Sequence, residues 1–588
     1  MLLHHGAWAA GISLIAFTAA TAQPRPAPEP GGTLVFAVES EPSNYDCQAN
    51  VSPSFLQAVA PHYSTLLKVD SAHYPAIVGD LAASWSVSQD QLTYTFKLRP
   101  DVLFHDGKPL TSSDVKATYL RIIKPPPGVI SARQGNYTAI GTIETPDPLT
   151  VVFQLQRPDA AMVVNLASPW NCIYQSAKLD ADPLFPTKHV LGTGPFAFTE
   201  HKKGESWTGR RWVHYFVPNQ PYLDGYEADF ISGTAVVKSM EAGRTMAGFR
   251  SFTPGERDEL KEALGDKITV QESPWLLNQM LVFNAKQAPF DDARVRRALS
   301  LAIDRWEMAF QLSHTTVMKY VGGLMRPGFG MATPDATLST LPGLSHDITA
   351  SREEARRLLA EAGVSKLSIT LVTRDLPGAY GPSADAVLNA WRAIGVTANE
   401  VRLNARDLHM AVESGHFEAA FDFDGDAVDD PSLQLQKYVS GSVSPSKHAM
   451  SSDRTLDKLY TDQATSSEPG RRADIVHEFE RRALTEAYAV PILWWNRIVV
   501  TSAAVKGWTL TPSLYVGQDL SGVWLDRQMS TPTVASDTAS QASVTVLAPE
   551  ATTSPTPGRQ TLAAGAPTSS ATNDATATAE RMGTNRVQ

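Results

Sequence analysis

The spacing of apolar and polar positions along the chain predicts strands that alternate with helices. From Leu92 to Leu98 (LTYTFKL) apolar and polar residues alternate, which predicts a half-buried strand. Further strands are expected at Thr33–Val38, Thr150–Leu155, Trp212–Val217, Gln279–Phe283, Leu367–Val372 and Val490–Val500. A chain that mixes strands and helices over such a length is expected to have an α/β architecture with several lobes.

Helical periodicity fills the intervals between these strands. The clearest case is Asp292–Arg305, where Val295, Ala298, Leu299, Ala302 and Ile303 form one apolar stripe. Another helix is expected to begin near Asp114, capped by Thr111 or Ser112. Three more are predicted from their caps and periodicity: Ser351–Ala362 with a Ser cap, Val387–Ile394, and Arg471–Glu486.

The two ends of the chain differ from its middle. Residues 7–22 are apolar and small and end in Ala20-Thr21-Ala22, which predicts that residues 1–22 form an export signal with an A-x-A-like cleavage site, although the preceding residues include His4 and His5 but no Lys or Arg. A buried N-terminal helix is the alternative, but the Pro-rich linker at 23–30 would break its continuation. From 530 to 588, Thr, Ala, Ser and Pro dominate, so a disordered tail is expected.

Composition and charge narrow the function classes. The 588 residues are 43% hydrophobic and 19% charged, which is ordinary for a globular protein of two or three domains. The net charge of −10 argues against nucleic acid as a partner. Cys47 and Cys172 can form a disulfide in an oxidising compartment or remain two buried thiols, and export favours the bridge slightly.

Catalytic and metal-binding patterns are weak. Ser113-Asp114-Val115-Lys116 matches S-x-x-K but lacks the companion motifs of penicillin-interacting enzymes. Asp422, Asp424 and Asp426 occupy positions 1, 3 and 5 of a calcium loop, but Ala427 stands where the loop needs Gly. We therefore expect neither an enzyme nor a bound metal or cofactor.

Three blocks in order along the chain resemble the extracellular solute-binding proteins of family 5, the peptide, dipeptide and nickel binders of ABC importers. The first block runs from Leu81 to Val115 and contains LTYTFKLRPDVLFHDGKPLTSSDV. The second is Gly192–Phe196 (GTGPF), and the third extends from Asn284 through PFDDARVRRALSLAIDR to Arg305. With weaker similarities further on, the resemblance covers about Gly31 to Trp524.

This resemblance implies a two-lobed Venus-flytrap fold, the type II-like periplasmic-binding-protein architecture, with an additional domain inserted in lobe one. On this basis lobe one comprises 31–68, 190–273 and 497–529, the insert comprises 69–189, and lobe two comprises 274–496. The implied function is that of a monomeric periplasmic protein that captures an oligopeptide or peptide-like solute. It would deliver this solute to an ABC permease in the inner membrane.

The resemblance also suggests where the ligand binds. A weak counterpart of the family's first cleft segment contains Glu41 and Tyr45, and the lobe-two segment contains Phe423, Asp424 and Asp426. Peptide binders of the family show Gly-Trp followed by an Asp that pairs with the peptide amine, whereas this chain lacks that Trp and has Ala427 in place of that Asp. Asp424 or Asp426 can substitute, because a buried carboxylate needs a cation.

Large aromatic residues near the expected lobe junctions are further candidates for the cleft, because Trp offers a broad contact surface and one hydrogen-bond donor. They are Trp170, Trp275, Trp494 and Trp495, and core or hinge packing is the alternative for each. The departure at Ala427 leaves open an amine-bearing, sugar-like or metal-chelate ligand instead of a peptide. From other functional classes, an exported hydrolase or a surface-adhesive or sensor protein also stays open.

Overall fold

The computed structural model describes residues 27–375, 380–441, 443 and 452–527. The predicted export signal (1–22), part of the Pro-rich linker (23–30) and the predicted tail (530–588) lie outside these residues. None of the helices in the described ranges is both long enough and apolar enough to cross a bilayer.

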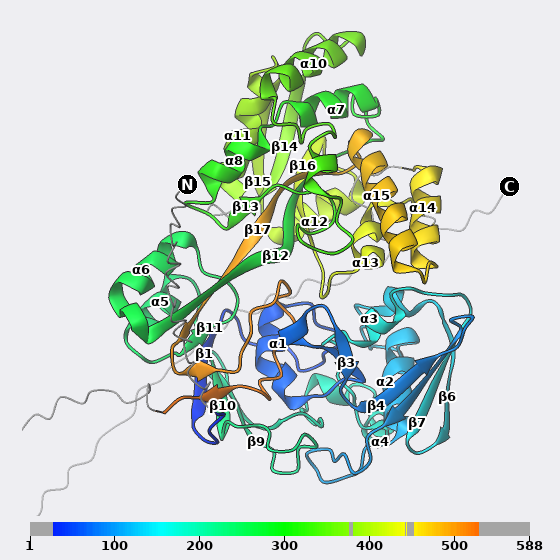
Figure 1. Ribbon diagram of the computed structural model, residues 1–588, viewed down its shortest axis with the longest axis vertical. Helices are drawn as coiled ribbons and strands as arrows, with labels where there is room; N and C mark the ends of the chain where they lie inside the picture. The colour runs from blue at the N-terminus through cyan, green and yellow to red at the C-terminus, as the bar shows by residue number, and fades with distance from the viewer. Residues whose placement is uncertain (1–26, 376–379, 442, 444–451, 528–588) are drawn as a thin grey trace, which may run out of the picture. The chain divides into compact units, whose positions relative to one another are not determined.

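In the described part of the chain, one eleven-stranded sheet connects elements far apart in sequence (Figure 1). Its strand order is β15-β14-β16-β12-β17-β11-β1-β10-β9-β8, and β13 also pairs with β17. The strands are β1 (Thr33–Val38), β8 (Phe196–Lys202), β9 (Ser206–Arg211), β10 (Gly225–Phe230), β11 (Ala247–Gly248), β12 (Ile268–Phe283), β13 (Met318–Tyr320), β14 (Ser368–Arg374), β15 (Thr397–Leu403), β16 (Ala419–Gly425) and β17 (Val490–Ser502).

Two long strands, β12 and β17, join the two halves of this sheet. Their antiparallel pairing runs from Ile268 opposite Ser502 to Leu281 opposite Val490. The register shifts between Pro274 and Asn278, where proline lacks the N–H that a regular ladder uses. We call β1–β11 with the chain after β17 lobe one, and the elements between β12 and β17 lobe two.

Lobe one contains a second sheet, which carries the first sequence block. Its strands are ordered β4 (Ala82–Val87), β5 (Thr93–Leu98), β7 (Thr150–Leu155) and β6 (Ile140–Asp147). Helix α2 (Ser112–Ile123) packs on β6 and β7, and the ring of Tyr119 meets that of Phe153 edge-on at 5.2 Å. The other elements of lobe one are α1 (Pro53–Val59), α3 (Met162–Leu166), α4 (Ser176–Ala181), α5 (Thr234–Glu241), α6 (Pro254–Leu264), β2 (Leu67–Val69), β3 (Ile77–Gly79), β18 (Val505–Lys506) and β19 (Trp524–Leu525).

The Gly-Thr-Gly-Pro block is a turn that lies directly against the chain at His62. The N–H of Gly194 donates to the carbonyl oxygen of His62 at 3.0 Å. A Cβ atom at Gly192 would approach that same oxygen to 2.2 Å, and one at Gly194 would meet the backbone at 2.4 Å. Glycine is therefore required here by close backbone approach.

Lobe two surrounds β14–β16 with helices, as Figure 1 shows. Helix α11 packs on β14 and β15, and α12 packs on the same two strands. Its helices are α7 (Ala293–Leu301), α8 (Arg305–Leu312), α9 (Asp335–Leu338), α10 (Ile348–Glu361), α11 (Tyr380–Arg392), α12 (Ala405–Ser414), α13 (Pro431–Leu435), α14 (Arg454–Ala464) and α15 (Pro469–Thr485).

The lobe-two core contains a buried carboxylate. Glu480 of α15 is fully buried, and burial raises the pKa of its carboxyl. It accepts hydrogen bonds from the N–H groups of Leu324 at 2.5 Å and Met325 at 2.9 Å, and from the hydroxyl of Thr333 at 2.5 Å. These hydrogen bonds attach the irregular segment that follows β13 to helix α15.

Several predicted elements are confirmed to within two residues, among them β1, β7 and β17, and Thr111 caps α2 in a capping box with Asp114. Several predictions are wrong in detail; among them, the helix expected at 387–394 is α11, which begins at Tyr380 and ends at Arg392. The strand expected at Trp212–Val217 is a turn region, because the alternating segment β9 precedes it. The helix expected over Asp292–Arg305 breaks, because Asp304 caps a new helix, and α10 begins at an Asp347 cap rather than at Ser351.

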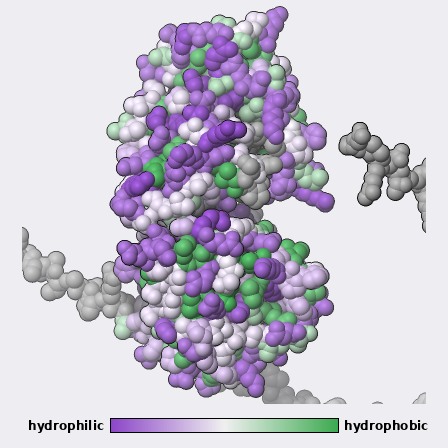
Figure 2. Space-filling model, turned by 90° about the vertical axis from the view of Figure 1, so that its right-hand side faces the viewer, coloured by the Kyte–Doolittle hydropathy of each residue, from purple (hydrophilic) through white to green (hydrophobic). Residues whose placement is uncertain are grey.

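Figure 2 shows how hydrophilic and apolar side chains are distributed over one face of the molecule. Its upper half is mainly hydrophilic, and apolar side chains are more frequent in its lower half, in small groups among polar ones. Such scattered apolar groups are ordinary for a monomeric surface.

Candidate functional site

A cavity of about 230 Å³ lies between the two lobes. Lobe two contributes the segment from Gly425 to Val428, which follows β16 directly, together with Leu433 and Gln436. Lobe one contributes residues from four segments, including Arg133, Trp170 and Tyr515. A larger cavity of about 430 Å³ is lined by lobe one alone. Because its lining comes from both lobes, the inter-lobe cavity can open and close with lobe movement.

On the lobe-two side, the cavity presents the carboxylate of Asp426. Burial, with the nearby carboxylates of Asp430 and Asp429, raises the pKa of Asp426 to about 7. Its one side-chain ion pair in the described residues is with the Lys437 ammonium, at the long distance of 3.4 Å. Burial lowers the pKa of Lys437 to about 8. An additional cation in the cavity would therefore stabilise the ionised form of Asp426.

On the lobe-one side, the cavity presents the guanidinium of Arg133. This group lies 4.0 Å from the centroid of the Trp170 ring, which is a favourable cation–π distance. Its Nη1 donates to the carbonyl oxygens of Asn50 at 2.8 Å and Cys47 at 3.4 Å. Burial lowers the pKa of Arg133 to about 10, so the group remains a cation at neutral pH. The two lobes thus bring opposite charges to one cavity.

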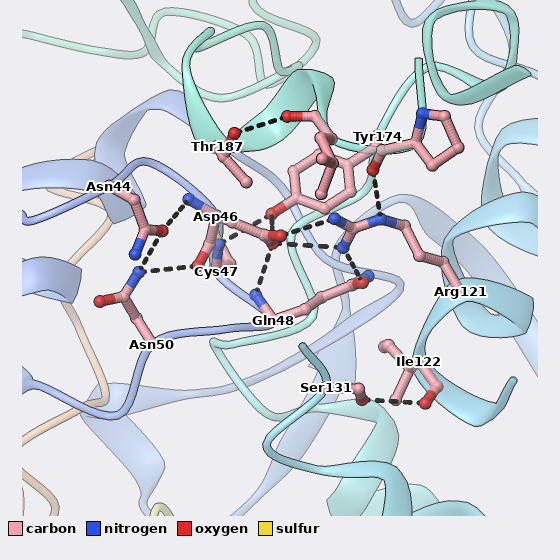
Figure 3. Close-up of polar contacts among 12 residues, drawn as sticks. Asn44, Asp46, Cys47, Gln48, Asn50, Arg121, Ile122, Ser131, Tyr174 and Thr187 are labelled. Atoms are coloured by element: carbon pink, nitrogen blue, oxygen red, sulfur yellow. Dashed lines mark hydrogen bonds and ion pairs between the residues drawn. The ribbon is translucent and has the colours of Figure 1, made fainter. Parts of the chain in front are cut away.

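The turn that holds Arg133 is organised around the buried carboxylate of Asp46 (Figure 3). Asp46 Oδ2 accepts from Arg121 Nη2 of α2 at 2.6 Å, and its Oδ1 accepts from the hydroxyl of Tyr174 at 2.9 Å and the N–H of Gln48 at 2.9 Å. The carbonyl oxygen of Gln48 then accepts from the N–H of Ala132, next to Arg133, at 2.9 Å. A buried, multiply bonded ion pair therefore fixes one wall of the cavity.

A disulfide attaches the Trp170 loop to the same turn. Cys47 and Cys172 are bonded, with their Cα atoms 6.1 Å apart across 125 residues of sequence. Trp170 stacks on Phe55 at 5.9 Å and contacts the ring of Tyr515 at 5.7 Å. The aromatic side of the cavity is thus held by a covalent link and by ring packing.

The sequence-based candidates divide between the cavity and other places. Trp170 and Asp426 line the cavity, whereas Phe423 lies on β16 and is 45% exposed, and for Asp424 the structure gives only its place on β16 opposite Asn278. Glu41 and Tyr45 lie elsewhere in lobe one, because each contacts one nitrogen of His201.

The remaining tryptophans pack inside the sheet and its helices. Trp494 is 1% exposed, and its Nε1 donates to the carbonyl oxygen of Gly323. Trp275 and Trp495 contact each other edge-on at 5.7 Å within the lobe-two core. Of these three rings, none lines the inter-lobe cavity.

Arg133, Asn136 and Tyr515 line the cavity but were not among the sequence-based candidates. Arg133 and Asn136 lie in the loop between α2 and β6, and Tyr515 lies after β17. The local sequence around them carries no periodicity or motif that would have identified them. Only the pairing of distant segments brings them together.

The chain is similar to known proteins in sequence and in fold. The pattern described as bacterial extracellular solute-binding proteins, family 5 Middle, matches residues 76–446. The probable D,D-dipeptide-binding periplasmic protein DdpA of Escherichia coli K12 is 25% identical over 504 residues, which cover 82% of this chain and 93% of DdpA.

Two solved structures share the fold. The first is the periplasmic binding protein AgaA of A. tumefaciens R10 in complex with agropinic acid. Its superposition on this chain has a TM-score of 0.71 at 24% sequence identity, and the matched region covers 84% of this chain and 99% of the AgaA chain. The binding protein DppA of Helicobacter pylori, in complex with the peptide STSA, also has a TM-score of 0.71 at 22% identity, with coverage of 84% and 98%. At these identities the likeness establishes the two-lobed fold.

Proposed function

The chain belongs to the bacterial extracellular solute-binding proteins of family 5, and from this premise we propose that it binds a small zwitterionic, peptide-like solute between its lobes. It would deliver this solute to the permease of an ABC importer. One observation carries the proposal: the Asp426 carboxylate of lobe two and the Arg133 guanidinium of lobe one line the same inter-lobe cavity.

The chemistry of the cavity selects for both ends of such a solute. A ligand ammonium would pair with Asp426, and a ligand carboxylate would pair with Arg133, each in surroundings that exclude most water. The volume of about 230 Å³ lies below the range of ~300–1,000 Å³ that is usual for drug-sized ligands. We therefore infer a solute of about the size of a dipeptide.

The second candidate is an amine-bearing solute that is not a peptide. Ala427 stands where peptide binders of the family have their amine-pairing Asp, so Asp426 would approach the ammonium from a neighbouring backbone position. AgaA, which shares the fold, is described in complex with agropinic acid, and this supports keeping a solute that is not a peptide as the second candidate.

The cellular setting is part of the same proposal. We infer that residues 1–22 direct export to the periplasm, where the protein acts as a monomer without catalytic activity. The proposed boundaries remain 31–68, 190–273 and 497–529 for lobe one, 69–189 for the insert and 274–496 for lobe two. The register shift at Pro274 supports a lobe crossing near that residue.

Isothermal titration of the purified protein tests the proposal with three probes: Ala-Ala, N-acetyl-Ala-Ala and Ala-Ala-amide. We expect Ala-Ala to bind, and each blocked form to bind about 100-fold more weakly, because it leaves one buried charge unpaired. Asp426→Asn should abolish discrimination against the acetylated form, and Arg133→Met should abolish discrimination against the amide. Glu41→Gln, a carboxylate change outside the cavity, is the matched control. Equal affinities for all three probes in the wild type would contradict the assignment.

A further inference from the structure

Outside the cavity, a tyrosine of lobe one reaches a carboxylate of lobe two. Tyr74 lies between β2 and β3, and its hydroxyl donates to Oδ2 of Asp429 at 2.8 Å. The same hydroxyl oxygen accepts from the N–H of Asp429 at 3.1 Å. One side chain therefore makes two hydrogen bonds across the lobe boundary, over 355 residues of sequence.

Lobe two holds its side of this contact in place independently of lobe one. Arg326, which follows β13, donates Nε and Nη2 to Asp429 Oδ2 at 3.0 and 2.9 Å. The neighbouring Asp430 caps α13 and accepts from both terminal nitrogens of Arg472 on α15, at 3.0 and 2.9 Å. Asp429 is thus a fixed acceptor, and Tyr74 meets it only when the lobes come together.

Two further contacts cross the lobe boundary at different points. The hydroxyl of Ser513, in the segment after β17, donates to the carbonyl oxygen of Ala427 at 2.5 Å. The N–H of Ala160 donates to the carbonyl oxygen of Ala464 at the end of α14, at 2.7 Å. Val428 of lobe two is 2% exposed and belongs to the apolar cluster of lobe one. Neither Tyr74 nor Ala160 lines the cavity.

We propose that Tyr74 and Asp429 form an inter-lobe latch that sets the closed-to-open ratio of the protein whether or not a solute is present. A ligand shifts this ratio only by its differential affinity for the two states. The latch adds a fixed contribution to the closed state, so it controls how long any captured solute is held. This role depends on lobe contacts and not on which solute the cavity takes.

The latch is tested by the distance between two spin labels on the full chain. Glu144→Cys on β6 and Lys458→Cys on α14 place labels on exposed positions of opposite lobes, and both native cysteines are already bonded to each other. Distance distributions are recorded by pulsed electron spin resonance without added solute. The result therefore does not depend on the proposed ligand.

We expect the doubly labelled wild type to show a short-distance, closed population. Tyr74→Phe removes both hydrogen bonds of the hydroxyl to Asp429 and should lower its closed-to-open ratio by about 10-fold or more. Ser513→Ala should shift the ratio in the same direction. Tyr226→Phe is the matched control, because its hydroxyl bonds only within lobe one, to Ala58 and His62.

Two results would overturn the latch. One is a wild-type distribution without a short-distance population. The other is a ratio that Tyr74→Phe and Ser513→Ala both leave equal to that of Tyr226→Phe. If the circular dichroism spectrum shows that either Tyr74→Phe or Ser513→Ala does not fold, the closed-to-open ratio of the other variant tests the latch. Failure of Ala-Ala to bind in the titration would count against the proposed function and leave this comparison intact.

Discussion

Lowering the pH from about 7 to about 5 is expected to weaken the binding of Ala-Ala through the protonation of one group, Asp426. Its carboxyl must be ionised to pair with the ligand ammonium, and its pKa of about 7 in the free protein means that this ionisation is lost in the acidic range. Lys437, with a pKa of about 8, stays protonated from pH 5 to 7 and does not contribute. The carboxyl group of the dipeptide, with a pKa near 3.5, is also unchanged.

The magnitude follows from linkage between binding and protonation. If the ligand ammonium lowers the pKa of Asp426 to the usual value of about 3.9, each pH unit below 7 costs about 1.4 kcal/mol of binding free energy. Because Asp426 is already half-protonated at pH 7, the affinity should fall by about 50-fold between pH 7 and pH 5. Because the pKa of Asp426 is lower in the complex than in the free protein, binding is strong above the free-state pKa and weakens as the pH falls below it. Above about pH 8 the ligand amine deprotonates, so affinity falls there too.

Isothermal titration at about pH 5, 6 and 7, in pairs of buffers with different ionisation enthalpies, measures both the affinity and the protons released. Near pH 7 about half a proton should leave Asp426 for each Ala-Ala bound. Asp426→Asn should bind weakly and without this pH dependence. Equal wild-type affinities at pH 5 and 7, or an unchanged slope in Asp426→Asn, would refute the assignment of this carboxylate to the ligand amine.

Three other predictions concern the walls of the cavity. Arg133→Met should weaken Ala-Ala by about 100-fold in the titration but leave Ala-Ala-amide unchanged; equal losses for both probes would contradict a role for Arg133 at the ligand carboxylate. Arg121→Met leaves Asp46 buried without its cation and should lower the free energy of unfolding by about 3–5 kcal/mol, measured by urea denaturation, whereas a loss below about 1 kcal/mol would contradict the importance of this ion pair. Reduction of the disulfide between Cys47 and Cys172, which closes a loop of 125 residues, should cost about 5 kcal/mol in the same assay, and an unchanged midpoint would contradict this estimate.

Local patterns of apolar, polar and capping residues in the sequence predict much of the secondary structure. The alternation in LTYTFKL and the capping residues before α2 predict β5 and the start of α2, because the determinants of each lie within a few residues. The continuous apolar run Val490–Val500 predicts the buried strand β17 for the same reason. Helix breaks were less predictable, since the apolar stripe over Asp292–Arg305 continues through the point where Asp304 starts a second helix.

The candidate site was predictable in part, through Asp426 on the lobe-two side and Trp170 on the lobe-one side. Asp426 follows a strand whose family resemblance marks the lobe-two segment, so its sequence position was informative. No local sequence pattern marks Arg133 or Tyr74, because their hydrogen-bond partners Asn50 and Asp429 lie 83 and 355 residues away in the sequence. Trp494 and Trp495 were selected as large aromatics near a lobe junction, but β17 is buried on both faces, so those rings pack in the core.

The central claim is that the inter-lobe cavity holds a small solute with both a cationic and an anionic group. Native mass spectrometry of the protein purified without unfolding, followed by denaturing release and fragmentation of the bound material, tests this claim most directly. We expect a released compound, or a set of compounds, of about dipeptide size that carries an amine and a carboxylate, and whose retention is lost in Asp426→Asn. A tightly bound compound that lacks either group, or one retained equally by Asp426→Asn and the wild type, would contradict it.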